Sequence, residues 1–177
     1  MGKRSEGFEK ISRDFYPTID PVAGEALARV IGPYTYYIEP CCGSGDLVNM
    51  LYEWGIYCEK STDVVTTFGE IKDATTYTKD DVEVADYFIT NPPFNWKMLQ
   101  PILDTLPEVL PTWLLLPADV MHNVRMGPYM KKCRKIVSIG RMYWFIEEDG
   151  KKVRGVDNYA WFEFVDHEVE TKFVGRI

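Results

Sequence analysis

The sequence predicts an α/β fold in which helices cover a mostly parallel sheet. Segments rich in aromatic and β-branched residues alternate with segments whose apolar residues recur at helical spacing, as in βαβ units. Further strand-like segments follow near the C-terminus. Two unusual motifs, residues 39–45 and 91–94, come directly after predicted strands. Ligands of such sheets bind at this end of the strands, so the motifs mark a candidate site.

The first half of the chain contains two predicted helices and two predicted strands. Residues 21–31 carry apolar side chains at helical spacing. Residues 34–39 are aromatic or β-branched in most positions and predict a strand. A second helix over 46–54 ends at Gly55, and residues 56–65 hold the second strand. Crossovers between the parallel strands are expected to be right-handed.

The second half contributes a longer helix and most of the strands. Residues 87–90 predict a strand that stops at a double proline. Residues 98–110 carry a helical apolar face that Pro107 interrupts near its end. Residues 113–116 predict a buried strand. The remaining predictions are a short helix over 128–135, strands over 136–139, 142–147 and 159–165, and a turn at Asp149-Gly150.

Length and composition limit the class of protein. The 177 residues, 46% of them hydrophobic, predict one domain over residues 1–177. A net charge of −7 argues against a protein that coats nucleic acid with its whole surface. No apolar run approaches the roughly 20 residues of a membrane span, and no signal peptide is evident, so we expect a cytoplasmic protein away from membranes. Four cysteines without a C-x-x-C pair, and two histidines, argue against a metal site.

Positive charge is concentrated between residues 124 and 154. This segment has 9 Lys and Arg against 3 acidic residues, whereas residues 1–123 have 9 against 19. Such a block is either a solvated face or a surface for a polyanion. The candidate phosphate contacts are Arg125, Lys131, Lys132, Arg134, Lys135, Lys151, Lys152 and Arg154.

The first motif, EPCCGSG at residues 39–45, joins the first strand to the second helix. Its glycines Gly43 and Gly45 allow a tight turn and the close approach of a ligand. The helix N-terminus offers free N–H groups, and Glu39 can accept hydrogen bonds from an ammonium or hydroxyl group. The G-x-G-x-x-G fingerprint and the Walker lysine are absent, so the motif alone leaves a plain turn open.

The second motif is Asn91-Pro92-Pro93-Phe94. The two prolines fix two φ angles and remove two N–H donors, and Pro92 keeps Asn91 out of the helical region. The result is a stiff loop that presents an amide, backbone carbonyls and an aromatic ring. A rigid turn with a packing phenylalanine is the alternative interpretation.

Together, the motifs resemble those of class I S-adenosylmethionine-dependent methyltransferases, most closely the small phage-type DNA adenine-N6 methyltransferases. Residues 38–47 are similar to the cofactor motif and residues 91–94 to the catalytic [DN]-P-P-[YFW] motif. Residues 14–18, 115–119 and 158–162 also resemble family segments, and the motifs follow the γ-type order. The resemblance covers most of the chain. It implies a Rossmann-like three-layer sandwich with an antiparallel C-terminal strand.

The resemblance implies S-adenosyl-L-methionine as the cofactor. Residues of the glycine loop would line its methionine part, and the N-terminal motif would close over it or simply pack there. Asp63 would bind the ribose hydroxyls, with Glu59 as the competing acid, and Asp73 would bind the adenine amino group or be a surface carboxylate. The implied cofactor-binding residues are Tyr16, Pro17, Thr18, Glu39, Cys41, Gly43, Gly45, Asp63 and Asp73.

The implied catalytic residues are Asn91, Pro92, Pro93 and Phe94. The Asn91 side-chain oxygen and the Pro92 carbonyl would accept hydrogen bonds from an exocyclic amine, and Phe94 would stack on a base turned out of its helix. The implied activity is methylation of the adenine N6 amino group in DNA. Transfer to RNA or protein glutamine, or a non-catalytic binding protein with this fold, are the alternatives.

The resemblance also bears on partners and origin. No separate target-recognition domain follows the core, so sequence specificity would be low or would come from a protein partner or a homodimer. The expected substrate is nucleic acid, with DNA favoured. A phage-encoded protein in the cytoplasm of its host fits the same resemblance.

Overall fold

The computed structural model describes residues 16–82 and 84–176; Asp14 and Phe15, which begin the N-terminal motif, lie outside them. The strands are β1 (Thr35–Glu39), β2 (Ile56–Asp63), β3 (Glu70–Ile71), β4 (Tyr87–Thr90), β5 (Thr112–Pro117), β6 (Cys133–Ile146), β7 (Lys152–Phe164) and β8 (Lys172–Val174). The helices are α1 (Pro21–Ile31), α2 (Asp46–Tyr52), α3 (Trp96–Val109) and α4 (Gly127–Met130), with short 3₁₀ turns between some elements.

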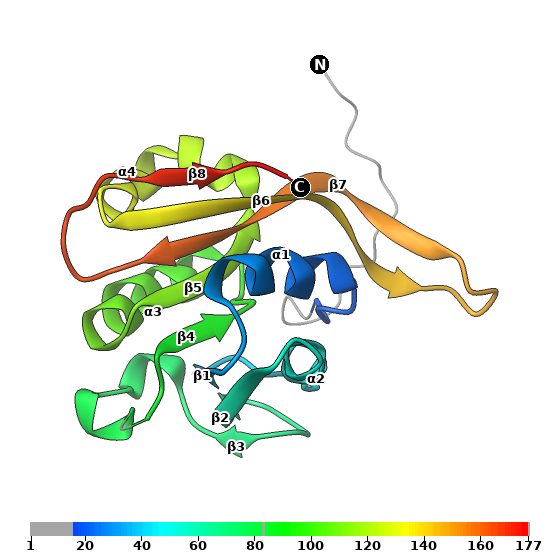
Figure 1. The fold of residues 1–177 in the computed structure, drawn as a ribbon, viewed down its shortest axis with the longest axis horizontal. Coiled ribbons are helices and arrows are strands. Elements are labelled where there is room, and N and C mark those ends of the chain that lie inside the picture. The colour runs from blue at the N-terminus through cyan, green and yellow to red at the C-terminus, as the bar shows by residue number, and fades with distance from the viewer. Residues whose placement is uncertain (1–15, 83, 177) are drawn as a thin grey trace.

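One sheet contains all eight strands, in the order β3-β2-β1-β4-β5-β7-β6-β8 (Figure 1). β1 pairs in parallel with β2 and β4, and β4 with β5. β7 runs antiparallel to both β5 and β6. The predicted fold class is therefore confirmed, a mostly parallel sheet with an antiparallel strand near the C-terminus. The two-residue β3 and the edge strand β8 were not predicted.

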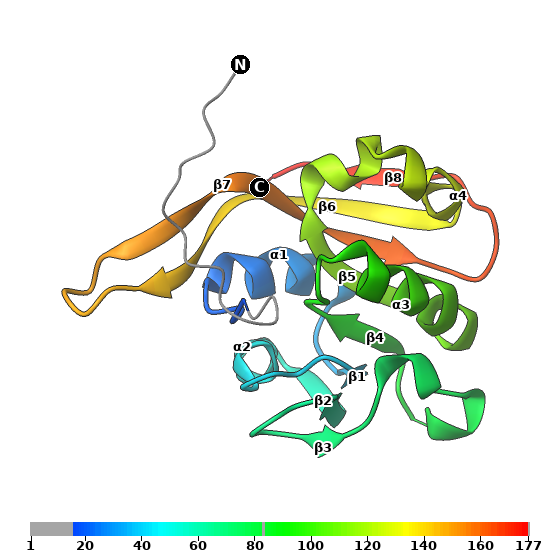
Figure 2. The ribbon, with the colours of Figure 1, turned by 180° about the vertical axis from the view of Figure 1, so that it is seen from behind.

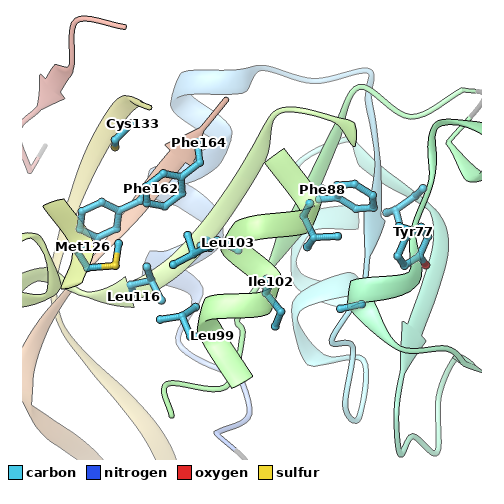
Figure 3. Close-up of a cluster of buried hydrophobic side chains, with 14 of the residues drawn as sticks. Tyr77, Phe88, Leu99, Ile102, Leu103, Leu116, Met126, Cys133, Phe162 and Phe164 are labelled. Atoms are coloured by element: carbon cyan, nitrogen blue, oxygen red, sulfur yellow. The ribbon is translucent and has the colours of Figure 1, made fainter. Parts of the chain in front are cut away.

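Helices cover both faces of the sheet, which gives three layers (Figures 1 and 2). α1 and α2 pack on one face, around Tyr37, Ile89 and Trp161. α3 packs on the other, where Figure 3 shows Leu103 directed toward Phe162. Successive strand residues point to opposite faces, so neighbouring positions on one strand belong to different cores. This explains why the central strands read as continuous apolar runs.

Helix α3 continues through the proline that was expected to interrupt it. It contains Pro101 and Pro107 and ends only at Val109. Its apolar stripe, which includes Leu103 and Leu106, is buried against the sheet. Tertiary packing of that stripe offsets the hydrogen bonds that the prolines cannot make.

The predicted short helix and separate strands over residues 128–147 are wrong in detail. α4 stops at Met130, and Cys133 already pairs with Phe164 in β6. β6 then runs unbroken to Ile146, because Gly140 takes a φ of +92° where the register shifts. A bulge of this kind bends a strand without ending it.

The β6–β7 hairpin extends beyond the rest of the sheet as an arm, residues 141–158 (Figure 1). Pro117 at the end of β5 pairs with Tyr159, and no strand in the described part of the chain pairs with the arm. The predicted turn at Asp149-Gly150 closes it, with Gly150 at a φ of +83°. The arm therefore projects past the carboxyl ends of the parallel strands.

Residues 16–20 form a strap that packs against the arm and against the loop after β4. Asp20 is 7% exposed and caps α1 by accepting a hydrogen bond from the Val22 N–H at 3.2 Å. Its second oxygen accepts from the Tyr143 N–H of the arm at 3.0 Å. Thus one carboxylate links the strap, the first helix and the arm.

No helix in residues 16–82 and 84–176 has both the length and the apolar character to cross a membrane.

Replacing Asp20 with alanine should lower the free energy of unfolding by about 2–3 kcal/mol, since it removes a helix cap and leaves the buried Tyr143 N–H unpaired. Urea unfolding followed by circular dichroism measures this loss. Asn123→Ala is the control because Asn123 makes a single, exposed capping bond, to the Arg125 N–H. Equal losses in the two variants would contradict a linking role for Asp20.

Candidate functional site

The loops after β1 and β4 lie at one edge of the sheet and border a cavity of about 940 Å³. Its volume is in the range of small-molecule sites. The strap, the end of β2 with the residues that follow it, and the first half of α3 also line the cavity. The predicted site residues that line this cavity are Tyr16, Pro17, Thr18, Glu39, Cys41, Gly43, Asp63, Asp73, Asn91, Pro92 and Pro93.

Gly45 and Phe94 do not line this cavity. Gly45 sits at the start of α2 with a φ of +84°, and a Cβ there would lie 2.5 Å from the Phe68 ring. Gly43 has a φ of +50° and donates its N–H to Asp63. Gly45 thus shapes the turn, whereas Gly43 borders the space. Both positive φ angles favour glycine.

The two predicted acids, Asp63 at the end of β2 and Asp73 beyond it, both line the cavity. The Asp63 carboxylate accepts hydrogen bonds from the N–H groups of Gly43 at 3.0 Å and Val65 at 3.2 Å. Asp73 accepts from the Thr75 N–H at 2.8 Å and also borders the space. Glu59, the competing acid, is exposed on β2 and is not among the lining residues. The position of Asp63 therefore favours it over Glu59 as a ligand-binding acid.

Glu39 is a buried acid with an unsatisfied oxygen. It is 1% exposed, and its Oε1 accepts from the Cys41 N–H at 3.1 Å. Its Oε2 has no hydrogen-bond partner among the described residues. Burial raises the pKa of Glu39 to about 8, the Thr90 hydroxyl and the Cys41 N–H oppose this shift, and the negative charge of Asp63 adds to it. A cationic ligand group beside Glu39 would satisfy this oxygen and restore its charge.

Asn91 presents a second unsatisfied acceptor. Its Nδ2 donates to the backbone carbonyl of Tyr16 at 2.9 Å and to the Thr18 Oγ1 at 3.1 Å. Its Oδ1 is buried and has no partner among the described residues. Buried polar atoms are nearly always paired, so this oxygen indicates where a donor of a ligand would bind.

Phe94 lines a second cavity of about 410 Å³, which Asp119, His122 and Asn123 also border. Its ring stacks on Tyr16 with centroids 5.9 Å apart and rings inclined by 20°. A base inserted between two stacked rings would need them about 7 Å apart, at roughly 3.5 Å for each stacking contact. A base that stacks on Phe94 must therefore approach from the second cavity or displace Tyr16.

The β6–β7 hairpin supplies aromatic neighbours of Phe94, and the sequence prediction missed one of them, Trp144. Trp144 and Tyr159 lie with ring centroids 6.5 Å and 6.0 Å from that of Phe94. Tyr159 falls in a segment that resembles the family, but Trp144 is buried by the long-range pairing of the arm. No local pattern signals such a contact.

The basic residues do not form the one surface that the sequence suggested. Lys131 and Lys132 come just before β6, and β6 begins beside the start of β5. Both lysines therefore lie at the end of the sheet opposite the cavity. They pair with Glu168 at 3.6 Å and Glu108 at 2.7 Å. In the same region, the guanidinium of Arg134 and the ammonium of Lys135 face the fully buried Glu163, Lys135 at 3.6 Å. These four cations are thus engaged with carboxylates.

The remaining cations lie on the side of the site. Lys151, Lys152 and Arg154 belong to the arm, and all three are exposed, although Lys151 also pairs with Glu147 at 3.5 Å. Arg125 lies over the ring of Trp96, in the first turn of α3, at 5.9 Å. Because Trp96 begins α3 two residues after Phe94, Arg125 is held close to the second motif.

No protein-family model and no curated protein sequence matches the chain. Solved structures do share its fold. A protein from Vibrio vulnificus described as the modification subunit of a type I restriction enzyme has a TM-score of 0.55 at 12% identity, over 93% of this chain and 47% of that one. A SAM-dependent O-methyltransferase from Thermotoga maritima gives 0.52 at 12%, over 91% and 70%.

A Listeria monocytogenes protein assigned to the class I S-adenosylmethionine-dependent methyltransferases gives 0.52 at 12%, over 87% of this chain and 62% of that one. The chain thus spans less than two thirds of the length of this protein and of the Vibrio subunit. At such identity these likenesses show the fold alone. The chain has the Rossmann-like fold of class I methyltransferases.

As the pH rises from 5 to 8, the free energy of unfolding of the wild type should fall relative to that of Glu39→Gln. In this window the folded protein holds a proton on Glu39, whose ordinary pKa is 4.5, while the unfolded chain does not. The wild type therefore loses stability with rising pH, by at most about 1.4 kcal/mol per pH unit, and the variant lacks this loss.

Urea titrations at several pH values give the difference between wild type and variant. Glu59→Gln removes an exposed carboxylate of β2 and should leave the pH dependence of the wild type unchanged. A pH-independent difference for Glu39→Gln would show that Glu39 is ionised in the folded protein.

Proposed function

We propose that the protein is an S-adenosylmethionine-dependent N-methyltransferase that acts on the N6 amino group of adenine in DNA. The observation that carries this proposal is the position of the second motif. Asn91, Pro92 and Pro93 border the large cavity, while Phe94 borders the smaller one. The unsatisfied Asn91 Oδ1 belongs to the same rigid loop. A methyl donor in one cavity and an acceptor at the other would meet at this loop.

The residues of the large cavity fit S-adenosylmethionine. The unpaired Oε2 of Glu39 suits the ammonium group of the methionine part, and the backbone at Gly43 leaves room beside it. Asp63 and Asp73 offer carboxylate oxygens for hydroxyl and amino groups. Bound there, the cofactor would supply a methyl group on a sulfonium sulfur, an electrophile with a neutral leaving group.

The chain's own contribution is to orient the acceptor amine. The lone pair of an adenine amino group is delocalised into the ring, which makes the nitrogen a poor nucleophile. Hydrogen bonds from its two N–H groups to the Asn91 Oδ1 and the Pro92 carbonyl would favour a tetrahedral nitrogen, whose lone pair can attack. After transfer the nitrogen loses one proton to water. Positioning of this kind supplies roughly 7–11 kcal/mol of a barrier.

DNA is the acceptor that the sequence motifs favour, through their likeness to phage-type adenine methyltransferases. The description of the Vibrio relative as a restriction-enzyme modification subunit agrees with this choice. The surface near the site agrees as well, because Arg125 and the cations of the arm lie on its side of the molecule. Sequence specificity would come from the arm, from a partner protein or from a second copy.

Transfer of a labelled methyl group from S-adenosylmethionine tests the proposal. With unmodified double- and single-stranded DNA, we expect label in N6-methyladenine. Asn91→Ala should reduce the rate at least about 100-fold, because the adenine amino group loses the oxygen to which it donates a hydrogen bond. Asn95→Ala is the control, since Asn95 caps α3 four residues later without facing the cavity. Label in RNA or protein would change the acceptor, and cofactor binding with no transfer would favour a binding protein.

Charge reversal at Lys151 and Arg154 together should weaken DNA binding about tenfold or more and make the salt slope about 2 units less steep, if both cations contact phosphates. Fluorescence anisotropy at several salt concentrations measures both quantities. Reversal at Lys131 and Lys132, on the opposite edge of the sheet, should change neither by as much. A larger effect from the second pair would place the DNA on the far edge.

A further inference from the structure

The strap holds the amide of Asn91 in one orientation. Both hydrogens of its Nδ2 are used, one by the Tyr16 carbonyl and one by the Thr18 hydroxyl oxygen. Turning the amide over would place Oδ1 at about the position of Nδ2, 2.9 Å from a carbonyl oxygen that cannot donate. The repulsion between two acceptors therefore selects the orientation in which Oδ1 remains free.

The strap itself is fixed at both ends. Thr18 is 4% exposed, and the Ile19 N–H donates to the Pro17 carbonyl at 3.0 Å. Asp20 anchors the strap to the first helix and the arm. At the other end, the Tyr16 ring lies against Phe94 and Trp144. The carbonyl and hydroxyl that contact Asn91 thus belong to a fixed segment that lies more than 70 residues before Asn91 in the sequence.

We propose that Thr18, with the backbone of Tyr16, is a positioning element of the acceptor site. It acts through Asn91, by directing Oδ1 toward the amine, and it need not contact the acceptor. This inference rests on the proposed function and adds a role to residues expected only to close over the cofactor. It also explains the choice of side chain at position 91, because an asparagine can donate to the Tyr16 carbonyl and a carboxylate cannot.

The decisive variants change the hydrogen bonds but little of the volume. Thr18→Val keeps the shape of the side chain and removes the hydroxyl, so we expect kcat to fall about tenfold, the effect of losing one hydrogen bond of about 1.4 kcal/mol. The dissociation constant of S-adenosylmethionine should stay within about twofold. Thr18→Ser restores the hydroxyl and should restore kcat to within about threefold of the wild type.

Asn91→Asp tests the same idea from the other partner. A carboxylate is the stronger acceptor for an amine, yet it would place a charged oxygen against the Tyr16 carbonyl. We expect kcat to fall at least about 100-fold with the same cofactor. An Asn91→Asp variant as active as the wild type would overturn the proposal, as would a Thr18→Val variant with weaker cofactor binding and unchanged kcat.

Side-chain amide signals in NMR spectra of ¹⁵N-labelled protein separate this inference from the proposed function. The Asn91 NH₂ signals, assigned by their loss in Asn91→Ala, should shift in Thr18→Val and return in Thr18→Ser. This holds whether or not any acceptor is methylated. If wild-type protein transfers no methyl group but the signals shift, the activity is wrong and the positioning is right. Unshifted signals would overturn the positioning.

Discussion

The parallel pairing of β1 with β4 is the constraint on which the site depends. Tyr37 lies opposite Tyr87 and Ile38 opposite Phe88, so the two strands end at nearly the same level. Each strand is followed by a loop that cannot continue it, a glycine turn in one case and a double proline in the other. A shift of register by one residue would reverse the faces of these buried side chains and separate the two loops.

This arrangement leaves polar atoms buried at the strand ends. Glu39 Oε2 and Asn91 Oδ1 are shielded from water and have no hydrogen-bond partner among the described residues, and both residues line the large cavity. Each such group lowers stability by about 1–3 kcal/mol unless a ligand satisfies it. Two of them at one cavity indicate that the fold is organised for a bound state, in which these atoms would be paired.

Local sequence patterns predicted the elements whose bounds depend only on nearby residues. The bounds of α1 and β4 follow from apolar spacing and from prolines, and both match the prediction. Both motif loops also lie at the predicted strand ends. In the arm, pattern predicted the first strand and the turn but missed the return strand, because Lys152 to Asn158 carry mostly exposed side chains of mixed type and become a strand only by pairing with β6.

Charge illustrates the same limit. Lys131 and Lys151 belong to one basic segment of the sequence, but β6 carries them to opposite ends of the molecule. Arg134 and Lys135 are drawn to Glu163, a buried carboxylate whose position in the sheet no local pattern shows. Nearness along a chain predicts nearness in space within a helix, but it fails along an extended strand, which advances about 3.3 Å per residue.

The arm has one further consequence, for association between chains. A two-stranded ribbon that leaves its sheet exposes backbone donors and acceptors along its outer edges, and such edges recruit strands from other molecules. On β6, Asp20 covers one of these donors by binding the Tyr143 N–H. Charged side chains such as Arg141 and Arg154 are exposed along the ribbon. The carboxylate that ties the strap to the arm therefore also hinders intermolecular β-pairing at this edge. Its loss would lower solubility as well as the stability of the fold.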